Sequence, residues 1–89
     1  MRLDKYLKVS RLIKRRTVAN EACDAGRITV NGKPARASYE VKVGDKLVIS
    51  MGAHPIQVEV TRIDEYAKKD EAALMYKNIA VGGSMSREE

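Results

Sequence analysis

Residues 26 to 32 read Gly26-Arg27-Ile28-Thr29-Val30-Asn31-Gly32, a segment that predicts the end of a helix and the start of a hairpin. Gly26 follows a helical pattern, and glycine readily adopts the left-handed conformation that ends many helices. Ile28 and Val30 are two positions apart, as in a strand with one buried face. Asn31-Gly32 is the dipeptide best suited to a type I′ turn, whose two central residues have positive φ.

Two amphipathic helices are predicted before this segment. In residues 2–8 the basic positions lie opposite Leu3, Tyr6 and Leu7, and in residues 16–25 the small apolar positions, including Cys23, share one arc. The intervening residues 9–16 are interpreted as a tight helical connection. The start of the second helix is left open, because Arg15 cannot cap it: either Thr17 begins the helix later, or its first amides face an anionic group such as a phosphate.

After the hairpin the pattern predicts further strands at 41–43, 47–49 and 56–60, with a turn at Gly44-Asp45. Residues 70–76 are predicted to form a short C-terminal helix. Tyr66, Met75 and Tyr76 are expected to complete the core, with a protein-docking surface as the alternative. The predicted fold class is α+β: two N-terminal helices packed on a small antiparallel sheet, with a short C-terminal helix. We expect one domain over residues 1–80 and a mobile tail over 81–89.

The charge of the chain is concentrated at its N-terminus. The net charge of the 89 residues is +5, but residues 1–36 hold ten Lys or Arg against three acids, a net of +7, and the remainder has a net of −2. Such a localised positive field favours a polyanionic partner, most commonly a nucleic acid. A solvated helical face, or an adaptor for acidic proteins, remains an alternative interpretation.

Seven of these cations fall in the two predicted helices and their connection and are expected to form one contiguous RNA-binding patch. They are Arg2, Lys5, Lys8, Arg11, Lys14, Arg15 and Arg16. Asp4 is the one acid within this run, placed to pair with Lys8 at i, i+4 near a helix start. Because arginine outnumbers lysine four to three in this patch, and its planar fork suits irregular RNA, RNA is predicted rather than DNA.

Other classes of function have less support in the sequence. No apolar run approaches the ~18 residues that a membrane span needs, so a cytoplasmic protein without membrane contact is expected. The single Cys23 excludes an internal disulfide, and Cys23 and His54 do not have metal-site spacing, so neither metal nor cofactor is predicted. The expected mechanism is binding, without catalysis.

The segment 26–32, together with Val41-Lys42-Val43-Gly44-Asp45, resembles the S-four RNA-binding domain and its αL motif. The opening Arg2-Leu3-Asp4-Lys5-Tyr6-Leu7 and the segment 71–76 narrow the resemblance to stand-alone members, which include the small heat-shock ribosome-binding protein. Residues 8–17 are most similar to the RqcP family of ribosome-associated quality control factors. The resemblance covers nearly the whole chain.

This resemblance implies a monomer that binds obstructed large (50S) ribosomal subunits carrying peptidyl-tRNA. It would contact rRNA and tRNA and help RqcH add alanine tails to the stalled nascent chain. The alternative is a heat-shock-type recycling factor that rescues such complexes without tailing. Position by position, the resemblance places the RNA contacts on Arg2 and Arg16, flanked by the five other cations, with Arg27, Lys33 and Arg36 as weaker candidates.

Overall fold

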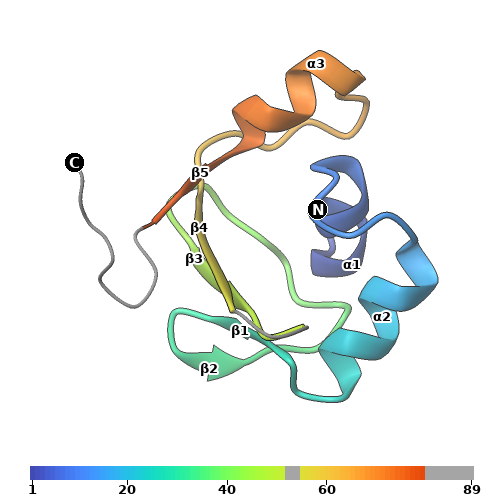
Figure 1. Ribbon diagram of the computed structural model, residues 1–89, viewed down its shortest axis with the longest axis vertical. Helices are drawn as coiled ribbons and strands as arrows, with labels where there is room; N and C mark the ends of the chain where they lie inside the picture. The colour runs from blue at the N-terminus through green and yellow to red at the C-terminus, as the bar shows by residue number, and fades with distance from the viewer. Residues whose placement is uncertain (52–54, 80–89) are drawn as a thin grey trace.

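Two helices open the chain in the computed structural model, which describes residues 1–51 and 55–79. Helix α1 (Leu3–Val9) and helix α2 (Arg16–Asp24) lie on the same side of a β-sheet (Figure 1). Gly26 has a φ of 79° directly after α2, which confirms the predicted helix stop. The predicted tail, residues 81–89, and His54 lie outside the described residues.

Five antiparallel strands form the sheet, in the order β2-β1-β3-β4-β5. Their bounds are β1 (Ile28–Val30), β2 (Lys33–Pro34), β3 (Lys46–Ile49), β4 (Ile56–Val60) and β5 (Tyr76–Asn78). The hairpin between β1 and β2 is confirmed: Asn31 and Gly32 have φ values of 53° and 88°, and Val30 pairs with Lys33.

The predicted strand at residues 41–43 is wrong. Val41 is buried and its N–H donates to the Met1 carbonyl, but Val43 is 63% exposed and no strand includes either residue. The Asp45 carboxylate accepts a hydrogen bond from the Lys42 N–H at 2.9 Å and thereby closes a turn. A turn fixed by a side chain therefore replaces the strand, because it satisfies backbone groups that a strand would pair with a neighbour.

The C-terminal helix exists, but only its first part is α-helical, and the helical stretch ends one residue earlier than predicted. Helix α3 (Lys69–Ala72) continues into the 3₁₀ turn η1 (Ala73–Met75), and Tyr76 is already extended as the first residue of β5. The Tyr6 hydroxyl donates to the Met75 carbonyl at 2.7 Å, and the Thr61 N–H donates to the same carbonyl at 2.9 Å. These tertiary bonds end the helix one residue earlier than the apolar spacing suggests.

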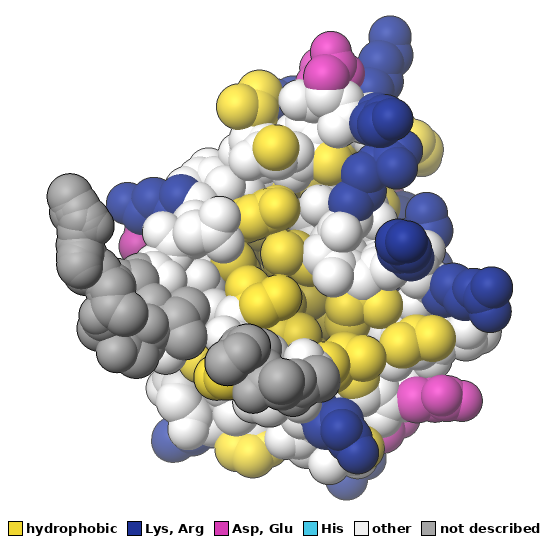
Figure 2. Space-filling view, in the orientation of Figure 1, with side chains coloured by type: hydrophobic (Ala, Val, Ile, Leu, Met, Phe, Trp, Pro, Cys, Tyr) yellow, Lys and Arg dark blue, Asp and Glu magenta, His cyan; other side chains and the backbone are white. Residues whose placement is uncertain are grey.

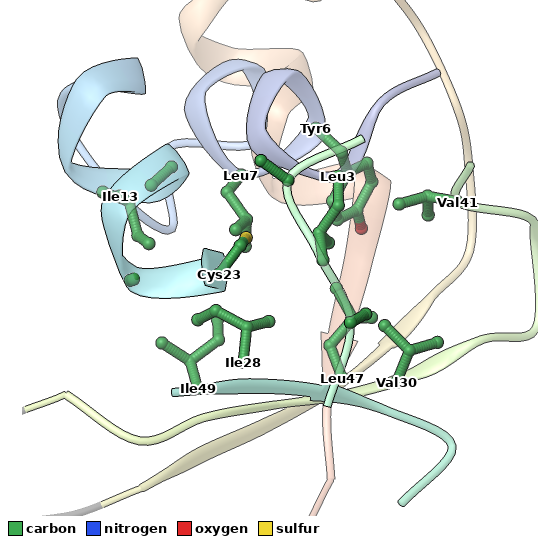
Figure 3. Packing of buried hydrophobic residues seen from close by; sticks show 14 of the residues in the cluster. Leu3, Tyr6, Leu7, Ile13, Cys23, Ile28, Val30, Val41, Leu47 and Ile49 are labelled. Atoms are coloured by element: carbon green, nitrogen blue, oxygen red, sulfur yellow. The ribbon is translucent and has the colours of Figure 1, made fainter. Parts of the chain in front are cut away.

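One hydrophobic core lies between the helices and the sheet (Figure 3). Leu3, Tyr6 and Leu7 of α1 are fully buried against strand residues that include Ile28 and Leu47. Cys23 points into the same space, and burial raises the pKa of its thiol to about 11. The thiol therefore stays protonated near neutral pH and packs as a small apolar group, as the sequence predicts. The α+β fold class is confirmed.

Candidate nucleic-acid interface

The seven predicted cations lie on α1, α2 and the turn that joins them. Arg2 precedes α1, Lys5 and Lys8 belong to it, and Arg16 begins α2. Six of the seven are exposed and Lys5 is half-buried. Figure 2 shows Lys and Arg side chains along the side of the molecule that carries the two helices. We call the surface formed by Arg2, Lys5, Lys8, Arg11, Lys14, Arg15 and Arg16 the helical cationic surface.

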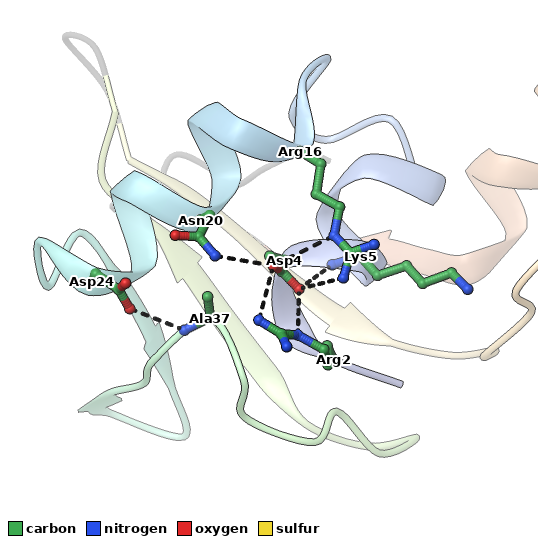
Figure 4. A network of polar contacts seen from close by, with 7 residues as sticks. All are labelled: Arg2, Asp4, Lys5, Arg16, Asn20, Asp24 and Ala37. Carbon is green, nitrogen blue, oxygen red and sulfur yellow. Dashed lines mark hydrogen bonds and ion pairs between the residues drawn. The ribbon is translucent and has the colours of Figure 1, made fainter.

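Arg2 and Arg16 converge on a buried carboxylate. Asp4 is 2% exposed, and its oxygens lie 3.2 Å from Arg2 Nε and 3.4 Å from Arg16 Nε (Figure 4). Asn20 Nδ2 donates to Asp4 at 3.2 Å and the Lys5 backbone N–H donates at 2.8 Å. The predicted pairing of Asp4 with Lys8 is wrong, because the carboxylate points toward α2 instead of along its own helix.

The Asp4 network keeps the carboxylate charged and orients both guanidinium groups. Burial by itself raises the pKa of Asp4, but hydrogen bonds from Asn20, Arg2, Arg16 and the Lys5 amide outweigh it, so the pKa lies below its usual value. Each arginine turns its Nε and Nη2 edge to Asp4. Their side chains remain 52% and 48% exposed, so the other donors can face a solvent-side anion.

Lys5 forms an ion pair that the sequence did not predict. Its Nζ lies 2.8 Å from Glu65 Oε1 and 5.8 Å from the centroid of the Tyr66 ring. The hydrogen bond from Lys5 holds the pKa of Glu65 below its usual range. Lys5 therefore joins α1 to the segment before α3. Tyr66 itself is 86% exposed, so its predicted place in the core is wrong, whereas Met75 is buried and Tyr76 packs against the core.

The predicted helical connection between α1 and α2 is a turn. Arg11 has a φ of 65°, which is strained for a residue with a side chain, and its N–H donates to the Lys8 carbonyl at 3.1 Å. Arg11 thus occupies the position after a helix C-terminus at which glycine is usual. The left-handed residue reverses the chain and lets Ile13 return to the core with 7% exposure.

Helix α2 begins at Arg16, so the alternative in which Thr17 begins the helix is wrong, and the alternative in which its first amides face a phosphate stays a prediction. Arg15 is the N-cap, with extended backbone and no side-chain hydrogen bond to the helix, and Thr17 is the second helical residue. The first turn contains no acidic residue. Its backbone N–H groups, beside Arg15 and Arg16, therefore form a local positive end.

The weaker candidates do not belong to the two helices. Arg27 follows α2, and Lys33 and Arg36, with Tyr39, line a shallow pocket at the β1–β2 hairpin. Among the described residues, no group of His, Cys, Asp or Glu could hold a metal ion. Every described helix is too short or too polar to span a lipid bilayer.

Comparisons with known proteins identify the family that the chain is similar to. The S4 domain family matches residues 1–47. Proteins named RQC P-site tRNA stabilizing factor are 57% identical in Halalkalibacterium halodurans, over 86% of this chain and 88% of the relative, and 55% identical in Bacillus subtilis, over 85% and 88%. Heat shock protein 15 of Escherichia coli is 33% identical over 90% of this chain and 61% of its own length. A trimeric structure of Vibrio cholerae heat shock protein 15 is also similar, with a TM-score of 0.84 and 27% identity over 90% of this chain and 82% of that chain.

Proposed function

Since this chain belongs to the S4 domain family, and within it to the RqcP family, we propose that it is an RNA-binding factor that stabilises tRNA on stalled large ribosomal subunits. It would bind the obstructed 50S subunit carrying peptidyl-tRNA and contact both rRNA and tRNA. With RqcH as its partner it would support alanine tailing of the nascent chain. Its action is binding, and no bond is made or broken by its residues. We also propose that residues 1–80 act as one RNA-binding unit.

The pair of arginines at Asp4 is the observation that carries this proposal. Two guanidinium groups held by one carboxylate, with part of each fork open to solvent, suit the oxygens of adjacent phosphates. An arginine side chain that is already oriented loses less conformational freedom on binding than a freely rotating one. The arrangement therefore favours RNA of defined shape, whose phosphates occupy fixed positions.

The rest of the helical cationic surface supports the same partner. Lys8, Arg11, Lys14 and Arg15 are exposed and form no ion pair among the described residues. Like charges on neighbouring residues repel within about a Debye length of ~8 Å, and RNA phosphates would relieve that repulsion. Displacement of the counterions around RNA then contributes to affinity, which makes binding depend steeply on salt.

Pelleting with purified 50S subunits at graded salt tests the proposal. Arg15→Ala should weaken binding and lower the slope of log affinity against log salt by about one, because one phosphate contact is lost. Arg15 is the informative choice because it forms no ion pair among the described residues. Arg2→Ala and Arg16→Ala should weaken binding further, since they also disturb the Asp4 network.

Lys77→Gln is the matched control. It removes one positive charge from the edge strand β5, where Lys77 lies near Glu59 and away from α1 and α2 in sequence. We expect its affinity and slope to stay close to wild type. Equal behaviour of Arg15→Ala and Lys77→Gln would contradict RNA binding through the helices.

The heat-shock-type recycling function is less well supported. The chain is 57% and 55% identical to the tRNA stabilizing factors, but 33% identical to the Escherichia coli heat shock protein. Co-purification with RqcH from stalled subunits separates the two functions. Absence of RqcH from such complexes, with 50S binding intact, would favour recycling.

A further inference from the structure

Tyr66 is an exposed aromatic ring beside the helical cationic surface. Its side chain is 86% exposed, which is more than any other large hydrophobic residue in the described part of the chain. The ammonium of Lys5, one of the seven cations, lies over its ring at 5.8 Å from the centroid. An aromatic ring thus extends that surface with a group of a different chemical kind.

The backbone that carries this ring is fastened at several points. The Tyr66 N–H donates to Asp64 Oδ1 at 3.0 Å, and the other oxygen of Asp64 accepts from Arg62 Nη2 at 2.8 Å. Glu65 binds the Lys5 ammonium at 2.8 Å and so ties the same segment to α1. The backbone at Tyr66 is therefore held in a defined position, which reduces the conformational entropy lost when a ligand binds there.

The surroundings of the ring favour a nucleic acid over a protein. Protein-binding patches are contiguous apolar areas, whereas the neighbours of Tyr66 are the charged groups of Lys5, Asp64 and Glu65. The charge of Glu65 is offset by its pairing with Lys5, so it opposes an approaching phosphate less than a free carboxylate would. Lys5 Nζ lies on one side of the ring, 5.8 Å from its centroid, and the 86% exposure of Tyr66 leaves the ring accessible to a ligand.

We propose that Tyr66 is a stacking site for an unpaired RNA base at the edge of the helical cationic surface. The inference rests on the proposed RNA-binding function and adds a specific contact to it. A base that has left its helix presents a flat π-face, and tyrosine binds such faces with little regard to base identity. The Lys5–Glu65 ion pair holds the segment that carries the ring against α1. The other six cations contact the phosphates.

Variants of Tyr66 test the site by 50S pelleting at graded salt. Tyr66→Leu keeps an apolar side chain but removes the ring, and it should weaken binding about 5- to 100-fold. The salt slope should not change, because stacking releases no counterions. Tyr66→Phe keeps the ring and should restore binding to within about twofold of wild type.

Leu74→Ala is the control for the loss of an exposed apolar side chain. Leu74 is 59% exposed on η1, and its aliphatic side chain has neither a ring nor a charge. Its variant should bind as wild type does. Wild-type binding by Tyr66→Leu, with Arg15→Ala impaired, would overturn the stacking site and leave the proposed function standing.

Two further outcomes are also decisive. If Tyr66→Leu binds 50S subunits normally but loses a protein partner such as RqcH, the ring docks protein and the inference is wrong. If the wild-type chain itself fails to pellet with 50S subunits even in dilute salt, the proposed function fails and the stacking site with it.

Discussion

Replacing Asp4 by Asn removes a negative charge from the contact between α1 and α2 with almost no change in side-chain size. The carboxylate accepts hydrogen bonds from Arg2, Arg16, Asn20 and the Lys5 amide. An amide retains one acceptor oxygen, and its NH₂ group would face donors instead of acceptors. At least two of the contacts are therefore lost, and α1 and α2 lose the carboxylate that both arginines share.

The size of the loss follows from the exposure of the partners. A hydrogen bond to a charged group contributes about 1.5–3 kcal/mol, and breaking a fully buried ion pair costs about 3–5 kcal/mol. The side chains of Arg2 and Arg16 are 52% and 48% exposed, so water solvates them once the carboxylate is gone. We therefore expect Asp4→Asn to lower the free energy of unfolding by about 2–3 kcal/mol, equivalent to a Tm decrease of roughly 10–20 °C in a domain of this size.

Circular dichroism during urea and thermal unfolding measures this loss, and its pH dependence identifies the cause. The pKa of Asp4 is lowered by folding, so its contribution is fully present above the ordinary value of 3.8 and disappears as the pH falls through the lower folded value. The difference between wild type and Asp4→Asn should be constant near neutral pH and shrink below about pH 4. Glu21→Gln, an exposed change on α2, should stay within about 0.5 kcal/mol of wild type.

Two results would refute the reasoning about Asp4. One is an unfolding free energy for Asp4→Asn within about 0.5 kcal/mol of wild type at neutral pH. The other is a loss of stability that persists undiminished at the acid end of the titration, since a protonated Asp4 and an asparagine should then behave alike. Either would mean that the ionised carboxylate does not hold the two helices together.

Two other substitutions test single features of the fold: the left-handed backbone at Arg11 and the buried hydroxyl of Tyr6. Arg11→Gly should raise the free energy of unfolding by about 1 kcal/mol relative to Arg11→Ala, because glycine adopts the φ of 65° without strain, while both variants weaken 50S pelleting equally. Equal stability of the two variants in urea titrations would contradict this. Tyr6→Phe removes a buried hydrogen bond of 2.7 Å to the Met75 carbonyl and should lower the free energy of unfolding by about 1–2 kcal/mol. A melting curve identical to that of wild type would show that backbone N–H groups, including that of Thr61, satisfy the carbonyl and that the Tyr6 hydroxyl adds no net stability.

The sequence was sufficient for elements that local chemistry specifies. Both helices, the stop at Gly26 and the turn at Asn31-Gly32 follow from short patterns that need no distant partner. The strand predicted at 41–43 is wrong because Val41 is buried whereas Val43 is exposed, and the turn that follows depends on the side chain of Asp45. Strand β5 was missed because it forms only by pairing with β4, whose paired residues lie 16 to 20 positions earlier in the chain.

The candidate site was likewise only partly predictable from the sequence. The cationic character of α1 and α2 is visible in the sequence, because it needs only a count and a helical period. The partners of those cations are not visible, since Asp4 meets Arg16 twelve positions away and Lys5 meets Glu65 sixty positions away. Asp4, two positions after Arg2, was a usable signal for the Arg2–Asp4 pair. The charged residues on both sides of Tyr66, Asp64-Glu65 and Lys68-Lys69-Asp70, were a usable signal that its ring is exposed.

These pairings divide the helical cationic surface into two kinds of charge. Asp4 holds Arg2 and Arg16, and Glu65 holds Lys5, so these cations keep fixed positions at some cost in net charge. Lys8, Arg11, Lys14 and Arg15 keep their full charge without an ion pair among the described residues. Unpaired charges act over a Debye length and chiefly raise the rate of encounter, whereas oriented groups act at contact distance and slow dissociation. The proposed function, to find a stalled ribosomal subunit and then hold its tRNA, needs both kinds of charge, and Asp4 and Glu65 provide the second kind without abolishing the first.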